Sequence, residues 1–72
     1  MHHRIKLLVR PKGTRDPFNR SIQLSIWHDA TPVALANAKL AVATLGWDIG
    51  QIIHFERYRE TGKNQGWEAC KP

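Results

Sequence analysis

The first stretch of regular structure is predicted by an alternation of apolar and polar residues between residues 4 and 10. Apolar side chains recur at every second position, at Ile5, Leu7 and Val9. Successive side chains of a β-strand point to opposite faces, so we expect these three in the core. The residues expected on the other face are Arg4, Lys6, Leu8 and Arg10, and they are mainly basic. We expect residues 1–3, which precede this strand, to be disordered.

A second strand is predicted from Ser21 to Trp27, after a break in the alternation. Residues 11–20 contain two prolines and a glycine and are therefore expected to form a long, basic loop. When the alternation resumes, Trp27 is expected on the outer face, and the inward residues are Ile22, Leu24 and Ile26. We expect the two strands to pair as an antiparallel hairpin.

A helix is predicted from Thr31 to about Leu45. Threonine can cap free backbone amides and Pro32 suits the first helical turn, while Gly46 can adopt the left-handed conformation that ends a helix. The expected inward stripe has spacings of three and four and comprises Ala34, Leu35, Ala38, Ala41, Val42 and Leu45. Leu40 falls on the opposite side, where an apolar residue has no role in the core.

The rest of the chain predicts two more strands, at residues 49–59 and 67–70, with a polar turn at residues 60–66. In the first of them Ile53 and Phe55 are expected to face the helix, and the other face is expected to carry Ile52, His54, Glu56 and Tyr58. Apolar residues on both faces favour a central strand. The predicted fold is an α+β domain of order β-β-α-β-β, with one helix packed on one face of a mostly antiparallel sheet. A right-handed crossover would place the third strand beside the first.

The length and the cysteine content limit the class of protein. The 72 residues suffice for a single small domain, residues 1–72, near the lower limit for folding without disulfides or metal. The one cysteine, Cys70, cannot form an internal disulfide, which fits a reducing compartment. No apolar run reaches the roughly 18 residues of a membrane span. We therefore expect a cytoplasmic protein without a membrane partner.

The sequence offers no recognisable catalytic or metal-binding pattern. None of its histidines, His2, His3, His28 and His54, has a partner at the spacing of a structural zinc site. The six carboxylates are scattered, and the phosphate-loop, dinucleotide-binding and zinc-protease motifs are absent from the sequence. Cys70 is read as a small residue of an edge strand rather than a reactive thiol. We expect no enzyme activity, no metal and no cofactor.

Charge and aromatic residues point to a binding role. A formal net charge of +5 and a pI near 10 favour acidic partners, although a charge of this size can also serve solubility alone. On the sheet face opposite the helix, cations would lie between aromatic rings, a combination found on nucleic-acid surfaces and at protein hot spots. Alternatively, Trp27 and Tyr58 cover a second, smaller core. The candidate binding residues are Lys6, Arg10, Lys12, Arg15, Arg20, Trp27, His54, Arg57, Tyr58 and Arg59.

Several segments resemble small phage and prophage proteins, among them anti-CRISPR inhibitors of type I surveillance complexes. The resemblance rests on the alanine-rich helix from Ala34 to Ala43, Gly46-Trp47, the strand through Ile53 and Phe55, and Gly66-Trp67-Glu68. It implies a non-catalytic inhibitor that docks on a host protein–RNA complex in the cytoplasm of a bacterial host. Many such inhibitors are acidic DNA mimics, and this basic chain departs from that pattern. The resemblance assigns no functional residue of those proteins to a position in this sequence.

These observations leave three interpretations. The leading one is an accessory protein of phage or mobile-element type that docks on a host protein or nucleoprotein complex, such as a CRISPR defence complex. The alternative is a module that binds DNA or RNA directly through the basic loop and the open sheet face. A third is a homo-oligomer subunit that hides this face.

Overall fold

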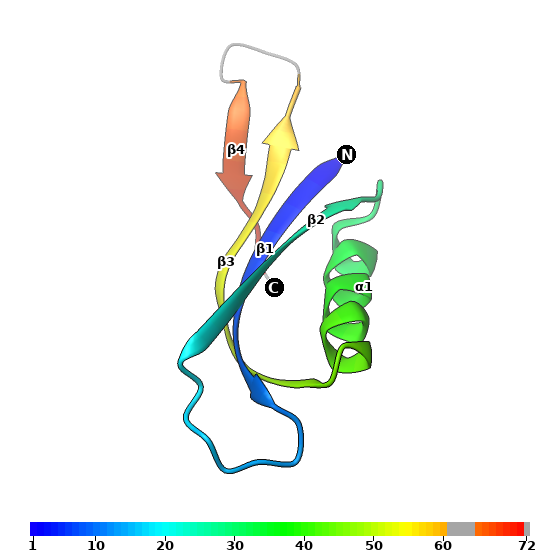
Figure 1. Ribbon diagram of the computed structural model, residues 1–72. Helices are drawn as coiled ribbons and strands as arrows, with labels where there is room; N and C mark the ends of the chain where they lie inside the picture. The colour runs from blue at the N-terminus through cyan, green and yellow to red at the C-terminus, as the bar shows by residue number, and fades with distance from the viewer. Residues whose placement is uncertain (61–64, 72) are drawn as a thin grey trace.

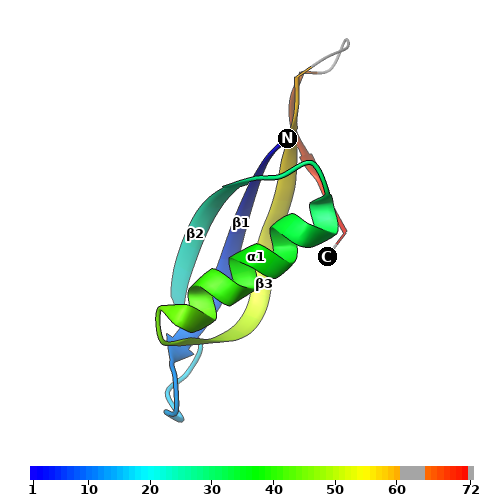
Figure 2. The same ribbon diagram turned by 90° about the vertical axis from the view of Figure 1, so that its right-hand side faces the viewer.

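The computed structural model describes residues 1–60 and 65–71 and confirms the predicted α+β fold. Its elements are β1 (His2–Pro11), β2 (Arg20–Trp27), α1 (Thr31–Thr44), β3 (Trp47–Arg59) and β4 (Gly66–Ala69). The helix lies across one face of a four-stranded sheet (Figures 1 and 2). The predicted polar turn at residues 60–66 lies mostly outside the described residues.

The strand order β2-β1-β3-β4 makes β1 and β3 the two central strands. Every neighbouring pair is antiparallel, and β3 lies beside β1 as expected. Because β2 and β3 are both antiparallel to β1, they are parallel to each other, and α1 connects them. The molecule is thus built around a β-α-β unit whose two strands are separated by β1.

The core forms where α1 meets β1 and β3. Its buried residues are Ile5, Leu7, Val9, Ala34, Ala38, Val42 and Phe55. The short side chains of Ala34 and Ala38 let the helix lie close to the sheet, and Ile22, Leu24 and Ile26 of β2 pack against the edge of this cluster. The inward faces predicted for the first two strands are therefore confirmed.

The inward face predicted for β3 is partly wrong, because its pairing with β1 is irregular. Lys6 pairs with His54, but the next residue, Leu7, pairs with Ile52. Ile53 therefore has no partner in β1 and forms a bulge. Such a bulge reverses the alternation of the strand. As a result Ile52 packs against the core and Ile53 is 37% exposed, the opposite of the predicted arrangement.

The bounds predicted for α1 are confirmed to within one residue, but both of its ends differ in detail. The N-cap residue is Ala30, and Thr31 makes no capping bond because its hydroxyl faces His3. At the other end the helix stops at Thr44, and Leu45 is 66% exposed in the turn that leads into Gly46. Ala41 is also exposed, so the buried stripe is narrower than predicted. Gly46 has the expected left-handed conformation, with φ of 91°.

The N-terminal residues, which we expected to be disordered, belong to the sheet. His2 and His3 begin β1, and His3 is fully buried on the same face as Ile5. Its position continues the alternation of the strand toward the chain start. The hydrogen bond between the His3 ring and Thr31 then joins β1 to α1.

The molecule is elongated, with principal extents of 46 × 19 × 15 Å. The β3–β4 hairpin extends beyond the helix at one end, and the loop between β1 and β2 lies at the other (Figure 1). Among the described residues, no helix is long and apolar enough to cross a membrane.

Candidate functional site on the open sheet face

The face of the sheet opposite α1, termed the open face, gathers most of the predicted binding residues. Residues directly opposite each other in neighbouring strands share a face. Lys6 lies opposite both Gln23 and His54, and Arg4 lies opposite Glu56. The open face therefore carries His2, Arg4, Lys6, Gln23, Trp27, His54, Glu56, Tyr58 and Trp67.

Aromatic rings occupy the end of the open face near the β3–β4 hairpin. Trp27 packs edge-on against His2 with ring centroids 4.6 Å apart, and Tyr58 packs in the same way against Trp67 at 5.3 Å. Trp27 remains 59% exposed, so it does not cover a second core. Tyr58 is half-buried against its partner. This end of the face therefore offers ring surface to a partner.

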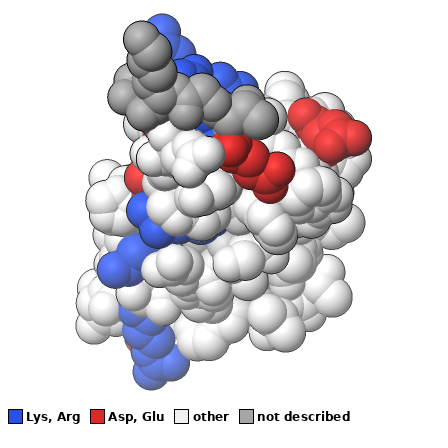
Figure 3. Space-filling view, turned by 90° about the horizontal axis from the view of Figure 1, so that it is seen from above, with Lys and Arg blue, Asp and Glu red and all other residues white. Residues whose placement is uncertain are grey.

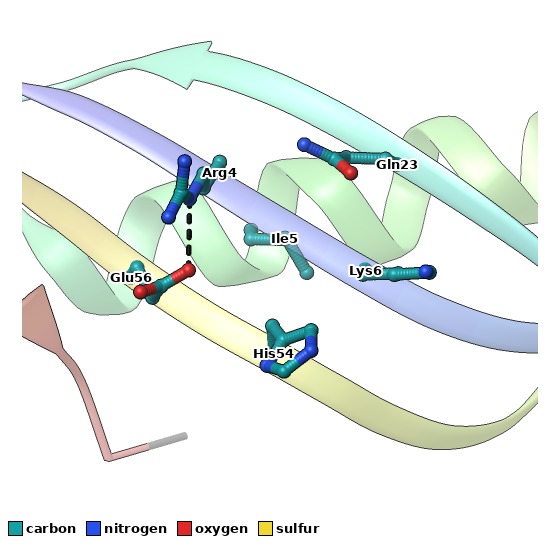
Figure 4. Close-up of a pocket in the computed structure, with 6 residues that line it drawn as sticks. All are labelled: Arg4, Ile5, Lys6, Gln23, His54 and Glu56. Atoms are coloured by element: carbon teal, nitrogen blue, oxygen red, sulfur yellow. Dashed lines mark hydrogen bonds and ion pairs between the residues drawn. The ribbon is translucent and has the colours of Figure 1, made fainter. Parts of the chain in front are cut away.

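A polar hollow of about 350 Å³ lies in the middle of the open face. Figure 4 shows the side chains that line it, Arg4, Ile5, Lys6, Gln23, His54 and Glu56. The guanidinium of Arg4 donates a 2.8 Å hydrogen bond from Nε to Glu56 Oε1, and this bond lowers the pKa of Glu56. The one carboxylate of the hollow is thus already neutralised by Arg4.

The three remaining polar side chains of the hollow come from three adjacent strands. Gln23, Lys6 and His54 form one row across β2, β1 and β3. Among the described residues, no acidic side chain forms an ion pair with Lys6 or His54. An ammonium, an amide and an imidazole side by side are suited to bind an anion.

Arg4 also links the hollow to the aromatic end of the face. Its guanidinium carbon lies 4.3 Å from the centroid of the Trp67 ring, within the range of a cation–π contact. The ion pair with Glu56 and this stacking hold Arg4 in place. Arg4 and Glu56 thus form a fixed, neutral ion pair between the rings and the hollow.

The loop between β1 and β2, residues 12–19 and here termed the basic loop, is shorter than predicted because Pro11 and Arg20 belong to strands. Phe18 anchors it: its ring lies against Gly50 and 4.3 Å from the guanidinium carbon of Arg10. Arg10 also lies 3.9 Å from Asp48 and donates to the backbone oxygen of Asp16. Arg10 therefore serves the structure of the loop.

The other cations at this end are available to a partner. Lys12 and Arg15 are exposed, and no described acidic residue forms an ion pair with them. Arg20, also exposed, lies over the ring of Trp47 at 5.6 Å. Lys12 and Arg15 extend the basic surface beyond the sheet, whereas Arg20 pairs with the buried Val9 and lies on the helix side.

Arg57 and Arg59, predicted to flank Tyr58, are separated from it by the sheet. Consecutive residues of a strand point to opposite faces, so Arg57 lies on the helix side, opposite Glu68. Its Nε donates a 2.5 Å hydrogen bond to Glu68 Oε1, which raises the pKa of Arg57. Arg59 lies 3.3 Å from the second oxygen of the same carboxylate. Arg57 and Arg59 thus both form ion pairs with the carboxylate of Glu68 at the hairpin.

Three basic residues of β1, Arg4, Lys6 and Arg10, lie on the open face, whereas Arg20 and Arg57 lie on the helix side of the sheet. Viewed from the hairpin end, Lys and Arg side chains line the flank formed by the sheet, whereas the flank formed by α1 shows none (Figure 3). Lys39 is the one charged residue within α1. The two sides of the domain therefore differ in chemistry.

The outward side of α1, termed the outer helix face, is largely apolar. Leu40 is 68% exposed, and Val33 and Leu45 are exposed as well. A shallow hollow of about 470 Å³ on this face is lined by Asn37, Leu40, Ala41, Thr44 and Leu45. The prediction that Leu40 points away from the core is confirmed. A helix that is apolar on both sides is usually buried on both, so this face is a candidate for contact with another molecule.

Other kinds of site find little support in the described part of the chain. Residues 1–60 and 65–71 contain no group of three or more His, Cys, Asp or Glu side chains placed to hold a metal. Burial raises the pKa of the Cys70 thiol, which lowers its reactivity as a nucleophile.

Sequence reasoning placed Arg4 on the open face but did not count it among the candidate binding residues. It also left Gln23 and Trp67 out of the candidate binding residues and assigned His2 to a disordered segment. The alternation of β1 and β4 contained the signal for Arg4 and Trp67, whereas their contact needed the strand order. Comparison with known proteins found no matching family, no similar curated protein and no similar solved structure.

Proposed function

We propose that this protein is a non-catalytic binding protein that docks on a nucleoprotein complex. The observation that carries the proposal is the contrast between its two sides. The open face presents cations and exposed rings, and the outer helix face presents apolar side chains with almost no charge. A partner made of protein and nucleic acid offers a complementary surface to each.

The open face fits the nucleic-acid part of such a partner. Phosphates attract Lys6, Lys12 and Arg15, which have no acidic ion-pair partner among the described residues. Flat rings such as Trp27 stack on bases irrespective of their sequence. Contacts of this kind give affinity with little sequence selectivity, as expected for a protein that recognises an assembled complex.

The outer helix face fits the protein part. An exposed apolar side chain gains free energy when a partner buries it, and Leu40 is 68% exposed on α1. An apolar helix face typically inserts into an apolar groove of its partner. The near absence of charge here would allow such an insertion at low desolvation cost.

The resemblance to small phage proteins supports one setting for this activity. In that setting the partner is a protein–RNA surveillance complex in the cytoplasm of a bacterial host, and docking inhibits a host defence system such as CRISPR. The basic open face would then engage guide RNA or target DNA, rather than imitate DNA as acidic inhibitors do.

A second candidate function is direct binding of nucleic acid by the domain alone. The observation that favours it is the group of exposed cations at the basic loop, which continues the charge of the open face. Under this alternative the outer helix face makes no contribution to binding.

Binding to a purified type I surveillance complex, and to its guide RNA alone, separates the two candidates. For the docking function, Leu40→Gln should weaken binding to the complex about tenfold or more and leave binding to free RNA unchanged. Lys71→Gln, far from α1 in sequence, serves as the surface control. Equal affinity for the complex and the free RNA, unaffected by Leu40→Gln, supports direct binding, and no binding to the complex overturns docking in this setting.

A further inference from the structure

We infer that the nucleic acid recognised by the open face is single-stranded, with its backbone running along β1 and bases stacked at the aromatic end. This inference rests on the proposed function and specifies its ligand. Three features of the open face support it: the exposed rings, the spacing of the cations and the polar hollow.

The exposed rings favour unpaired bases as partners. In a duplex the faces of the bases are stacked on one another, and a protein reaches only their edges through a groove. The major groove admits a helix or a narrow two-stranded ribbon, whereas the open face is a four-stranded surface with its helix on the other side. Trp27, 59% exposed, can offer its ring only to a base that has left the stack.

The cations on β1 have the spacing of an extended backbone. Arg4 and Lys6 are two residues apart on the same face, and one strand residue advances about 3.3 Å, so their Cα atoms are roughly 6.6 Å apart. Successive phosphates of an extended single strand are separated by a similar distance. Beyond the end of β1 lie the exposed cations Lys12 and Arg15.

The polar hollow is suited to seat one phosphate of that backbone. Lys6 supplies a positive charge, and Gln23 and His54 on either side supply hydrogen-bonding groups (Figure 4). The carboxylate of Glu56 would repel a phosphate, but Arg4 binds it at 2.8 Å and offsets its charge. The hollow is adjacent to Arg4, which stacks on Trp67. A strand seated in the hollow can therefore continue onto the rings.

Fluorescence anisotropy with a labelled oligonucleotide of about 12 nucleotides tests the inference, since this length lies within known single-strand site sizes. The wild-type protein is titrated with the single strand, with the same sequence as a duplex, and with an abasic strand of equal charge. The variants are Trp27→Ala, which removes a stacking ring, and Lys6→Gln, which removes a phosphate contact. Lys39→Gln on α1 is the matched charge control.

The inference predicts tighter binding to the single strand than to the duplex or the abasic strand. Trp27→Ala should weaken binding to the single strand roughly 5- to 100-fold and hardly change binding to the abasic strand. Lys6→Gln should lower the slope of log affinity against log salt by about 0.7, the value for one phosphate of a single strand. Lys39→Gln should change neither quantity.

The outcomes distinguish this inference from the proposed function. The single-strand inference is overturned if the duplex binds equally or more tightly and Trp27→Ala and Lys6→Gln behave like Lys39→Gln. Nucleic-acid binding itself would still be supported by that result. Failure to bind any of the three oligonucleotides at low salt overturns the inference as well. In that case, docking on the intact surveillance complex decides the proposed function separately.

Discussion

The ring of His3 and the hydroxyl of Thr31 lie 3.0 Å apart and join the start of β1 to the first turn of α1. This contact accounts for two local features, the ordered N-terminal residues and the absence of a threonine cap on the helix. His3 is the one buried polar residue among those described. Its environment makes the stability of the fold depend on pH.

We expect the free energy of unfolding to decrease as the pH falls below about 6.5, the ordinary pKa of histidine. Burial lowers the pKa of His3 in the folded state, so the unfolded chain takes up the proton first. The contribution of neutral His3 to the free energy of unfolding is complete above pH 6.5. It is lost as the pH falls through the lower pKa that His3 has in the folded state. Urea unfolding between about pH 7.5 and 5 measures it, and His3→Gln should flatten the profile in this range. An unchanged profile in that variant would show that another group is responsible.

Phe55→Ala should destabilise the protein by about 3–5 kcal/mol, because it empties a buried site between α1 and the sheet. Ile53→Ala, two residues away on the bulge, should cost less than about 1 kcal/mol, because Ile53 is already partly in solvent. Leu24→Ala at the edge of the core should fall between them, at about 2 kcal/mol. Urea titrations of the three variants give this order. Equal losses for Phe55 and Ile53 would contradict the bulge.

Gly50→Ala should displace Phe18 from the sheet. A Cβ at Gly50 would come within 2.5 Å of Cγ and Cδ1 of the Phe18 ring, a distance that side chains do not tolerate. The ring can move because it belongs to a loop, so we expect a modest loss of about 1 kcal/mol and altered ring NMR shifts of Phe18. In a Phe18→Ala background the same substitution should cost nothing further, and a double-mutant cycle reports the coupling.

The double variant Arg15→Ala, Arg20→Ala should bind nucleic acid more weakly without unfolding. Both residues are exposed, and Arg20 loses only its contact with Trp47. If each arginine contacts one phosphate of a single strand, the salt slope should decrease by about 1.4. Lys39→Ala, Lys71→Ala removes the same charge elsewhere and is the control. Equal effects of the two double variants would mean that net charge alone acts.

The sequence predicted the elements that follow a strict period. The alternation in β1 and β2 placed Ile5, Leu7 and Leu24 correctly, because both strands keep an unbroken period of two. The same rule failed in β3 at Ile53, because a bulge arises from pairing with β1 and leaves no local signal. The predicted helix cap also failed, because the hydroxyl of Thr31 bonds to His3, twenty-eight residues earlier in the sequence.

The sequence predicted which face of the sheet most site residues occupy, but it did not predict which of them contact one another. Alternation alone could have placed Arg57 on the side opposite Tyr58, since the two are consecutive in one strand. The pairing of Arg4 with Glu56, which frees the polar hollow for an anion, depends on the strand order β2-β1-β3-β4. The place of β3 beside β1 was predicted, but the register between the two strands could not be read from any single segment.

The position of β1 between the two strands that α1 connects has a consequence for folding kinetics. The β1–β2 hairpin can close early because its strands are separated by a short loop, but on its own it is only marginally stable. The pairing of β1 with β3, in which His3 lies opposite Arg57, can form only after α1 has brought β3 back beside β1. Such a distant pairing has a high entropic cost of loop closure, so the return of β3 should limit the folding rate of the whole domain.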